Sequence, residues 1–233
     1  MAAFYRAQLD CTIVGVTGSV GKTSTKELIA TVLEQRFCVQ KTQGNFNNEI
    51  GLPLTIFSIK EEHEVAVVEM GISDFGEMSR LGAIAKPDIC VITNIGVAHL
   101  EMLKSRDGIL QAKTEVIPYI PQDGILILNG DDDKLATVKE VCRCEERTVA
   151  FYGVGKDSAY GVAKSAYATD LVAIGTEGMK AHYCVGDEGF DATILIPGEH
   201  NVYNALAAAL AGKALGMTCE EIREGMEKAT TIS

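Results

Sequence analysis

A glycine-rich segment near the N-terminus, Gly15-Val16-Thr17-Gly18-Ser19-Val20-Gly21-Lys22-Thr23, restricts what this chain can fold into more than any other feature. A β-branched run over residues 12–16 leads into it, and apolar residues at helical spacing follow over residues 22–35. Glycines in such a turn let successive backbone N–H groups point at one anion, and the following helix N-terminus adds partial positive charge. The segment therefore predicts a strand–loop–helix unit that binds phosphate.

Two side chains at the end of this loop indicate a nucleotide. Lys22 supplies a full positive charge for the outer phosphates, and the Thr23 hydroxyl is a suitable ligand for magnesium. The usual pattern G-x-x-x-x-G-K-[ST] has a glycine where this chain has Val16. The alternative is an ordinary glycine-rich turn with a chance lysine. Because Gly21-Lys22-Thr23 stands between a strand and a helix, we interpret the segment as a nucleotide-binding loop.

Short apolar runs alternate with helical patterns over most of the chain. Strand candidates lie at residues 12–16, 37–40, 65–68, 89–93, 125–128 and 148–152, and helix candidates at 22–35, 76–85, 104–117, 134–141, 201–215 and 219–228. This alternation predicts an α/β fold with a P-loop-type, mainly parallel sheet flanked by helices. Alternating segments at 180–185 and 192–196, separated by glycines, predict a small antiparallel sheet near the C-terminal third.

Composition excludes several classes of function. With 233 residues the chain is long enough for one large α/β domain or two small ones. A net charge of −11 disfavours nucleic acid as a partner. No apolar run approaches the roughly 20 residues that cross a bilayer, so no membrane insertion is expected. The seven cysteines contain no C-x-x-C pair, and Cys142 and Cys144 lack zinc partners nearby, which indicates reduced thiols in a cytoplasmic protein.

A carboxylate stands where a parallel strand should end. Glu69 directly follows the apolar run 65–68. In phosphate-loop proteins an acid at the carboxyl end of such a strand holds magnesium, directly or through water. The alternative is a solvated glutamate at a strand end, which is common.

Other polar residues carry a weaker signal by themselves. His99 lies a few residues beyond the strand expected at 89–93, where spacing alone favours an ordinary loop residue over a metal ligand. Lys113, on an expected helix, reads as a surface lysine. Asn47 and Asn48 read as part of an asparagine-rich turn with a helix cap.

Together these segments resemble the central domain of the Mur ligase family. The resemblance rests on Val16-Thr17-Gly18-Ser19-Val20-Gly21-Lys22-Thr23-Ser24, Gly44-Asn45-Phe46-Asn47-Asn48-Glu49-Ile50-Gly51-Leu52-Pro53, Glu69-Met70-Gly71, Thr93-Asn94-Ile95-Gly96, His99-Leu100-Glu101, Ala112-Lys113 and Gly198-Glu199-His200-Asn201-Val202-Tyr203-Asn204-Ala205. It extends from about residue 11 to the end of the chain. The asparagine-rich block is similar to the branch that adds D-alanyl-D-alanine.

The resemblance implies roles for individual residues in binding ATP and magnesium. The ATP-binding residues would be Thr17, Gly18, Ser19, Val20, Gly21, Lys22, Thr23, Ser24, Asn47, Asn48, Asn94, Asn201 and Asn204, with Asn47 or Asn48 near the γ-phosphate and the last two near adenine. Thr23 and Glu69 would hold one magnesium ion, and His99 would help to hold a second. Lys113 matches a lysine that is carbamylated in several family members. Lys22, Glu69, His99 and Lys113 would form the catalytic set.

The resemblance also implies an activity and a domain organisation. The expected reaction is ADP-forming amide ligation in peptidoglycan precursor synthesis, joining D-alanyl-D-alanine to UDP-N-acetylmuramoyl-tripeptide through an acyl phosphate. Residues 1–10 would be a linker remnant and residues 11–233 the central ATP-binding domain. The N-terminal UDP-sugar domain and the C-terminal ligase domain, through which those two partners bind, would lie outside this chain. We therefore expect the chain alone to lack useful ligase activity.

Three alternatives are kept open by the sequence. A folylpolyglutamate or cyanophycin synthetase shares this domain type, and substrate choice would lie mostly in the other domains. A regulatory module could use nucleotide as a structural ligand. An unrelated phosphate-loop ATPase or kinase is disfavoured, because it leaves the asparagine block and His99 unexplained.

Overall fold

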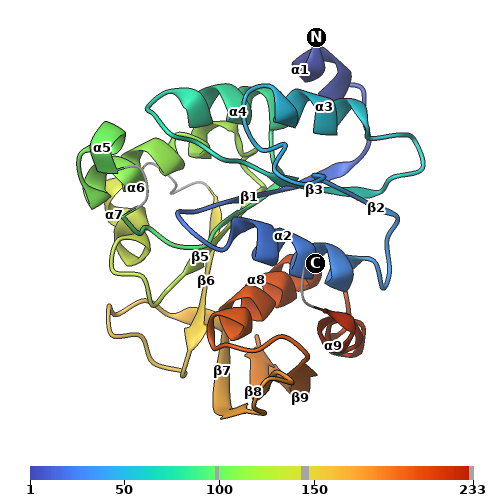
Figure 1. Cartoon of the computed structure of the whole chain (residues 1–233), viewed down its shortest axis with the longest axis vertical. Helices are drawn as coiled ribbons and strands as arrows, with labels where there is room; N and C mark the ends of the chain where they lie inside the picture. The colour runs from blue at the N-terminus through green and yellow to red at the C-terminus, as the bar shows by residue number, and fades with distance from the viewer. Residues whose placement is uncertain (98–99, 143–146, 231–233) are drawn as a thin grey trace.

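One continuous sheet organises the structure, a computed structural model that describes residues 1–97, 100–142 and 147–230. It has nine strands in the order β2-β3-β1-β4-β5-β6-β7-β8-β9 (Figure 1). The strands paired in parallel are β1 (Thr12–Thr17), β2 (Val39–Lys41), β3 (Val65–Glu69), β4 (Ile89–Ile92), β5 (Ile125–Asn129), β6 (Thr148–Val154) and β7 (Lys164–Ala173). Antiparallel pairing then adds β8 (Met179–Val185) and β9 (Glu188–Ile194) to the same sheet.

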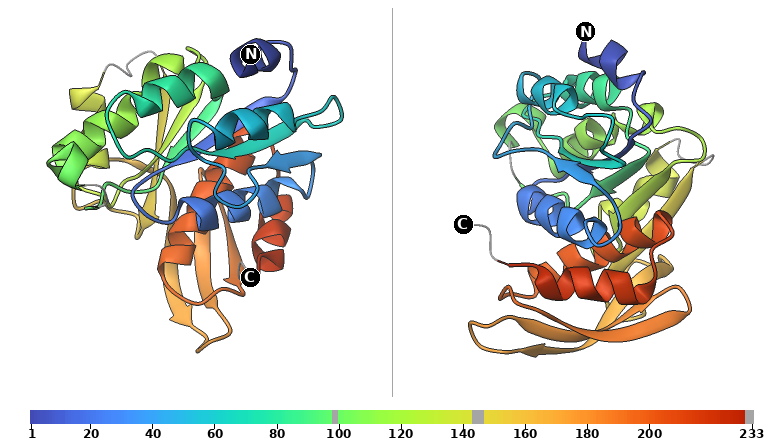
Figure 2. Two further views of the ribbon diagram at one scale, coloured as in Figure 1. Left: turned by 45° about the horizontal axis from the view of Figure 1, so that its top comes forward. Right: turned by 90° about the vertical axis from the view of Figure 1, so that its right-hand side faces the viewer.

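Helices cover both faces of the sheet (Figure 1). One face carries α2 (Lys22–Leu33), α8 (His200–Ala214) and α9 (Cys219–Lys228), and the other carries α3 (Gly51–Phe57), α4 (Glu77–Ala85) and α6 (Arg106–Thr114). The remaining short elements are α1 (Ala2–Arg6), α5 (Leu100–Leu103), η1 (Ile117–Tyr119), η2 (Leu135–Thr137) and α7 (Val138–Val141). Figure 2 shows α8 and α9 lying against the antiparallel strands β7–β9.

Alternation along β1 divides the interior into two cores. Val14 and Val16 point to the core beneath α2 and α8, whereas Ile13 points to the core beneath α3 and α4. All three side chains are fully buried. A strand covered on both faces reads as a continuous apolar run, and the run at residues 12–16 has this form because β1 lies inside the sheet between β3 and β4.

The predicted fold class is confirmed, and most of the predicted elements are present. The predicted antiparallel strands near the C-terminal third are also confirmed, and they continue the parallel sheet without a break. Thr218 caps α9 in a reciprocal capping box with Glu221, which fixes the predicted start of that helix. Gly216, with φ of 76°, ends the preceding helix region as predicted.

Some boundaries differ from the prediction for local reasons. The helix expected at 104–117 begins only at Arg106, because the Ser105 side chain caps it by accepting from the backbone N–H of Gly108. It ends at Thr114, and a 3₁₀ turn containing Pro118 follows. For α3 the sequence gives a single signal, which is the helix cap predicted in the asparagine-rich segment that contains Asn48.

β7, a ten-residue strand, was not predicted as a separate element. Its C-terminal half is mostly exposed, so burial does not impose a regular apolar alternation there.

The first ten residues pack onto the domain. They contain α1, whose Tyr5 hydroxyl donates to the carbonyl of Ile59 at 2.7 Å. The Arg6 guanidinium donates through Nε to the carbonyl of Ala85 at 2.9 Å. Both contacts join α1 to the helical layer formed by α3 and α4.

No helix in the described ranges is long and apolar enough to cross a bilayer. Cys144 lies outside those ranges, and the cysteines within them are free thiols.

Candidate functional site

The sheet topology brings the ends of three strands together. Val16 of β1 pairs with Glu69 of β3, and Thr17 pairs with Ile92 of β4. The glycine loop therefore leaves the sheet between the last residue of β3 and the loop that follows β4. This is the carboxyl edge of a parallel sheet, where ligands bind in open α/β folds.

Glycine is required at two positions of the loop. Gly18 has φ of 147° and Gly21 has φ of 80°. A Cβ atom at Gly18 would lie 1.9 Å from the Thr93 hydroxyl oxygen. Both positions use backbone conformations that side chains rarely adopt, and Gly18 also has no room for one.

The loop after β4 braces the glycine loop. Asn94 accepts through Oδ1 from the Val20 N–H at 3.1 Å and donates through Nδ2 to the Val20 carbonyl at 3.0 Å. Its backbone carbonyl accepts from the Ser19 N–H at 3.0 Å. The Thr93 hydroxyl adds a bond of 2.8 Å to the Val20 carbonyl. Asn94, a predicted ATP-binding residue, therefore has its amide engaged on the loop itself.

The donors available to an anion lie at the start of α2. The backbone N–H groups of Lys22, Thr23 and Ser24 have no hydrogen-bond partner among the residues that the structure describes. Lys22 lies across the loop, with Nζ 3.1 Å from the Gly18 carbonyl. Burial lowers the pKa of Lys22, and the nearby Glu69 carboxylate partly offsets this effect. These donors fit the phosphates of a nucleotide.

Glu69 is a buried carboxylate held by neutral groups. Its side chain is only 1% exposed. Oε2 accepts from the Thr23 hydroxyl at 3.0 Å, and Oε1 accepts from Asn47 Nδ2 at 2.8 Å. The Thr42 hydroxyl accepts from the Glu69 backbone N–H at 3.0 Å and so fixes the end of the strand. Hard oxygen donors from Glu69 and Thr23 beside a phosphate cradle fit a magnesium ion.

The asparagine block forms one wall of a cavity next to Lys22. Gly71 N–H donates to the Asn47 carbonyl at 2.7 Å. Asn48 Oδ1 accepts from the backbone N–H groups of Ile50 at 3.1 Å and Gly51 at 2.9 Å, so it caps α3. The cavity has a volume of about 470 Å³ and reaches from Lys22 past both asparagines to Glu77.

Lys113 is not the surface lysine that its position on a helix suggested. It is 3% exposed and lies in the last turn of α6. Burial lowers its pKa to about 7, and the positive charge of Lys22 acts in the same direction. The amine is therefore substantially unprotonated near neutral pH, which makes it a nucleophile.

His99 lies outside the described residues, so its predicted place in the metal site stays a prediction. In the ranges that are described, no group of three or more His, Cys, Asp or Glu side chains is arranged to hold a metal ion. Among the residues that the structure describes, Thr23 and Glu69 are the predicted magnesium ligands that lie together.

The predicted adenine residues lie on the first turns of α8. Asn201 is 3% and Asn204 7% exposed. Asn201 Nδ2 donates to the Pro197 carbonyl at 2.8 Å, and Asn204 Nδ2 donates to Asn201 Oδ1 at 3.1 Å. The Thr25 hydroxyl lies 2.8 Å from both Asn204 Oδ1 and the Gly21 carbonyl.

This hydrogen-bonded chain connects α8 to the glycine loop. A cavity of about 250 Å³ opens beside it, lined by Asn201, His200 and Ser24 and not by Asn204. Both amides are hydrogen-bonded inside the protein, and of the two only Asn201 lines the cavity.

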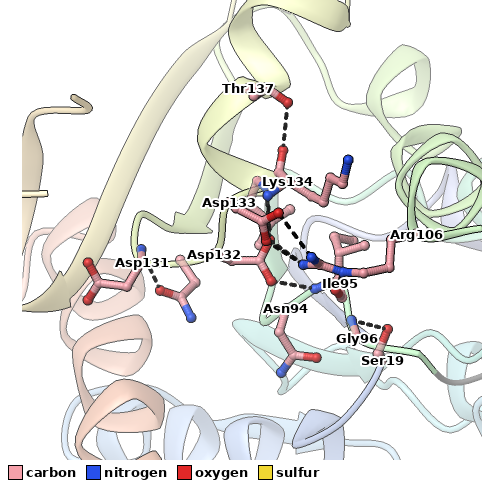
Figure 3. Close-up of polar contacts among 12 residues, drawn as sticks. Ser19, Asn94, Ile95, Gly96, Arg106, Asp131, Asp132, Asp133, Lys134 and Thr137 are labelled. Atoms are coloured by element: carbon pink, nitrogen blue, oxygen red, sulfur yellow. Dashed lines mark hydrogen bonds and ion pairs between the residues drawn. The ribbon is translucent and has the colours of Figure 1, made fainter. Parts of the chain in front are cut away.

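Sequence reasoning missed several residues that shape this site. Asp131, Asp132 and Asp133 follow β5 at the same sheet edge, together with Arg106 at the start of α6 (Figure 3). The sequence does contain a signal for the aspartates, because the polar segment Asn129-Gly130-Asp131-Asp132-Asp133 directly follows the apolar run 125–128. Thr25 and Thr42 gave no such signal, because each acts through a partner distant in sequence.

The chain was compared with known proteins. Residues 16–212 match the Mur ligase middle domain. The UDP-N-acetylmuramoyl-tripeptide–D-alanyl-D-alanine ligase of Bacillus subtilis is 41% identical over 228 residues, which cover 97% of this chain and 46% of that protein.

Two solved structures are similar over nearly the whole chain. MurF of Acinetobacter baumannii has a TM-score of 0.90 and 31% identity, and the match covers 99% of this chain and 49% of that one. MurF of Thermotoga maritima in complex with ADP has a TM-score of 0.84 and 29% identity, with 99% and 51% covered. The present chain spans about half the length of the relatives it matches.

Proposed function

Because this chain belongs to the Mur ligase family through its middle domain, we propose that it binds MgATP for an ADP-forming ligase. The proposed reaction joins D-alanyl-D-alanine to UDP-N-acetylmuramoyl-tripeptide, as the names of the relatives suggest. Residues 11–233 would form the central domain of a longer cytoplasmic enzyme, and the two peptide substrates would bind mainly through its other domains.

The observation that supports this proposal most is the contact of Glu69 with Thr23 beside unbonded N–H groups at the start of α2. In the proposed reaction a carboxylate oxygen of the tripeptide attacks the γ-phosphorus, and the bond to ADP breaks. The amine of D-alanyl-D-alanine then attacks the acyl phosphate carbon, loses a proton and displaces phosphate. Such transfers depend on positioning and on neutralising charge at the phosphates.

Each part of the site has a task in this reaction. The Lys22 ammonium and the backbone N–H groups at the start of α2 would bind the β- and γ-phosphates, while Ser19 and Val20, whose own N–H groups bond to Asn94, would shape the loop. Magnesium neutralises phosphate charge, and Thr23 and Glu69 would hold one such ion, with His99 contributing to a second. The cavity lined by Asn47 and Asn48 would receive the acyl substrate.

The adenine end is proposed at the cavity beside α8. Asn201 lines this cavity, and because its amide already bonds to Pro197 and Asn204, only its second N–H and second lone pair would remain for a base. Asn204 supports Asn201 and the loop from inside.

We also propose that Lys113 is carbamylated. Its unprotonated amine can add carbon dioxide, forming an N–C bond and releasing one proton. The product is an anion, and the nearby positive charge of Lys22 would stabilise it. Carbon-13 NMR of the chain in labelled bicarbonate would show a carbamate signal that Lys113→Met removes. A spectrum without that signal would contradict carbamylation in this chain.

The function is tested in two steps. Calorimetry of the chain with ADP and magnesium should show binding that Lys22→Ala weakens. In a complete ligase that contains this chain as its middle part, Lys22→Ala and Glu69→Gln should abolish phosphate release that depends on both tripeptide and D-alanyl-D-alanine. A nucleotide with only a structural role would leave that turnover largely intact. Turnover with glutamate in place of D-alanyl-D-alanine would favour a folylpolyglutamate synthetase.

The chain alone should lack this turnover. Domain closure excludes water and aligns reactants, and effective-molarity arguments assign about 7 kcal/mol or more to such alignment. Substrate-dependent phosphate release at full rate from the 233-residue chain would contradict this expectation.

A further inference from the structure

Three consecutive aspartates follow β5, and Figure 3 shows Asp132 and Asp133 on the side of Ile95 and Arg106, with Asp131 apart from them. Asp131 binds the backbone N–H of Val154 at 2.7 Å and pairs with the buried Lys164 at 2.6 Å. Asp132 instead contacts the loop that follows β4, and Asp133 binds Arg106. The nucleotide contacts proposed above involve none of the three.

Asp132 has both carboxylate oxygens occupied. Its side chain is 8% exposed. Oδ2 accepts from the Ile95 backbone N–H at 2.8 Å, and Oδ1 accepts from the N–H groups of Lys134 at 2.9 Å and Leu135 at 3.0 Å. One oxygen thus binds the β4 loop while the other caps the turn that leads into η2.

Arg106 holds the carbonyl side of Ile95, whose N–H is bonded to Asp132. Its Nε donates to the Ile95 carbonyl at 2.8 Å. Asp133 fixes the guanidinium by accepting from both terminal nitrogens, at 2.9 Å from Nη1 and 2.5 Å from Nη2. Both the N–H and the C=O of Ile95 are therefore held by charged side chains, which form stronger hydrogen bonds than neutral ones.

The neighbours of Ile95 hold the glycine loop. Asn94 binds Val20 through both ends of its amide, and the Gly96 N–H donates to the Ser19 hydroxyl at 2.9 Å. Ile95 lies between them and is 1% exposed. A shift of the Ile95 backbone would move both contacts together, and with them the loop that leads into the start of α2, where the N–H groups proposed to bind phosphate lie.

We propose that Asp132 and Arg106 are positioning residues for phosphate binding. They fix the segment Thr93-Asn94-Ile95-Gly96, and this segment fixes Ser19 and Val20 of the loop. The inference rests on the proposed binding of MgATP at this loop. Binding sites of this kind depend on loop amides that are already in place before the ligand arrives.

The substitution Asp132→Asn tests the proposal with little change in shape. An asparagine can keep its oxygen on Lys134 and Leu135, but it then presents an NH₂ group to the Ile95 N–H. Asp107→Asn is the matched control, because Asp107 pairs with Lys134 next to the same site and is 75% exposed, and among the described residues it has no hydrogen bond or ion pair to segment 93–96. Arg106→Lys is a second test that keeps the charge and removes the guanidinium fork.

Two measurements on the whole chain distinguish two roles of Asp132, which are positioning of the glycine loop and local capping of the turn before η2. Hydrogen exchange by NMR without nucleotide should show the Val20 and Gly96 amides exchanging about tenfold faster in Asp132→Asn and in Arg106→Lys. Neither amide bonds to Asp132 directly, so a merely local cap would leave them unchanged. Calorimetry should show MgADP affinity about tenfold weaker in both variants, with Asp107→Asn like wild type in both measurements.

The outcomes separate this inference from the proposed function. Wild-type exchange at Val20 and Gly96 in both variants would overturn the inference, as would MgADP affinity equal to that of Asp107→Asn. A wild-type chain that does not bind MgADP would contradict the proposed function. The exchange rates would then still decide whether Asp132 and Arg106 hold the loop. If Asp132→Asn does not fold, Arg106→Lys gives the same two readouts.

Discussion

The Thr23 hydroxyl donates to Glu69 Oε2 at 3.0 Å, although 46 residues separate the two in sequence. The contact exists because Val16 and Glu69 are paired across β1 and β3, so the glycine loop starts beside the end of β3. Burying a carboxylate costs free energy, and positive charge near it reduces that cost, from Lys22 in this chain and from a metal ion when one is bound. The pair is therefore the feature of this chain most directly suited to a metal ion.

Replacing Glu69 by glutamine should remove the metal dependence of nucleotide binding. Glutamine can accept from Asn47 and donate to the Thr23 hydroxyl, so the fold should persist. Affinity for ADP in magnesium should fall at least about tenfold, which corresponds to about 1.4 kcal/mol, and should no longer respond to chelation of the metal. Calorimetry with and without EDTA measures this. Glu62→Gln, at a 60% exposed side chain far from the loop, is the control. Unchanged MgADP affinity in Glu69→Gln would contradict the metal site.

Alanine at Gly18 should destabilise the fold strongly. The new Cβ would meet the Thr93 hydroxyl oxygen at 1.9 Å, and φ of 147° is unfavourable for alanine. We expect a loss of about 3 kcal/mol or more in the free energy of unfolding, from strain and overpacking together. Gly186→Ala is the control for backbone strain alone, because Gly186 also has positive φ, 61°, and a Cβ added there would have no atom within 4 Å. It should lose about 1 kcal/mol. Equal losses in urea unfolding would show that the contact with Thr93 does not matter.

The sequence predicted the glycine loop and the strand-end glutamate because both depend on local order. A loop between a strand and a helix, and an acid after an apolar run, are visible in neighbouring residues. The burial of Lys113 could also have been predicted. Lys113 follows Ile109 by four positions and Leu110 by three, so it shares their apolar face of α6.

Other features could not be predicted, because they depend on contacts between distant segments. The engagement of Asn204 requires Thr25, which lies 179 residues away. The role of Asp132 requires the placement of β5 directly beside β4, and strand order is not encoded in local periodicity. Similarly, the resemblance implies a nucleotide contact for Asn94, and its bonds to Val20 become visible only when the strand order brings the β4 loop beside the glycine loop.

Truncating Asn204 should show the connection between α8 and the glycine loop. Asn204→Ala leaves the buried amide oxygen of Asn201 without its donor and the Thr25 hydroxyl without one partner. We expect a loss of about 2 kcal/mol in stability. A double-mutant cycle with Thr25→Ala should give a coupling energy of about 1 kcal/mol from urea unfolding. Additive effects of the two substitutions would indicate that the contact between Asn204 and Thr25 contributes nothing.

Lys113 should make the stability of the chain depend on pH in the alkaline range. Its pKa is about 7 in the folded protein, against an ordinary value of 10.5. Between these values the unfolded chain binds a proton that the folded chain does not, so the free energy of unfolding rises with pH. The slope from this group approaches about 1.4 kcal/mol per pH unit, while below pH 7 both states are protonated and the burial cost is fully present.

Lys113→Met should therefore be stabilised relative to wild type at pH 7, and this advantage should shrink as the pH approaches 10. Urea unfolding at several pH values in bicarbonate-free buffer measures the difference, because carbamylation would otherwise change the charge of the group. Lys60→Met, at a side chain 69% exposed, should track wild type across the same range. If Lys113→Met and wild type differ by the same amount at pH 7 and pH 10, the lysine is protonated in the folded state, and the uncharged nucleophile that carbamylation requires is absent.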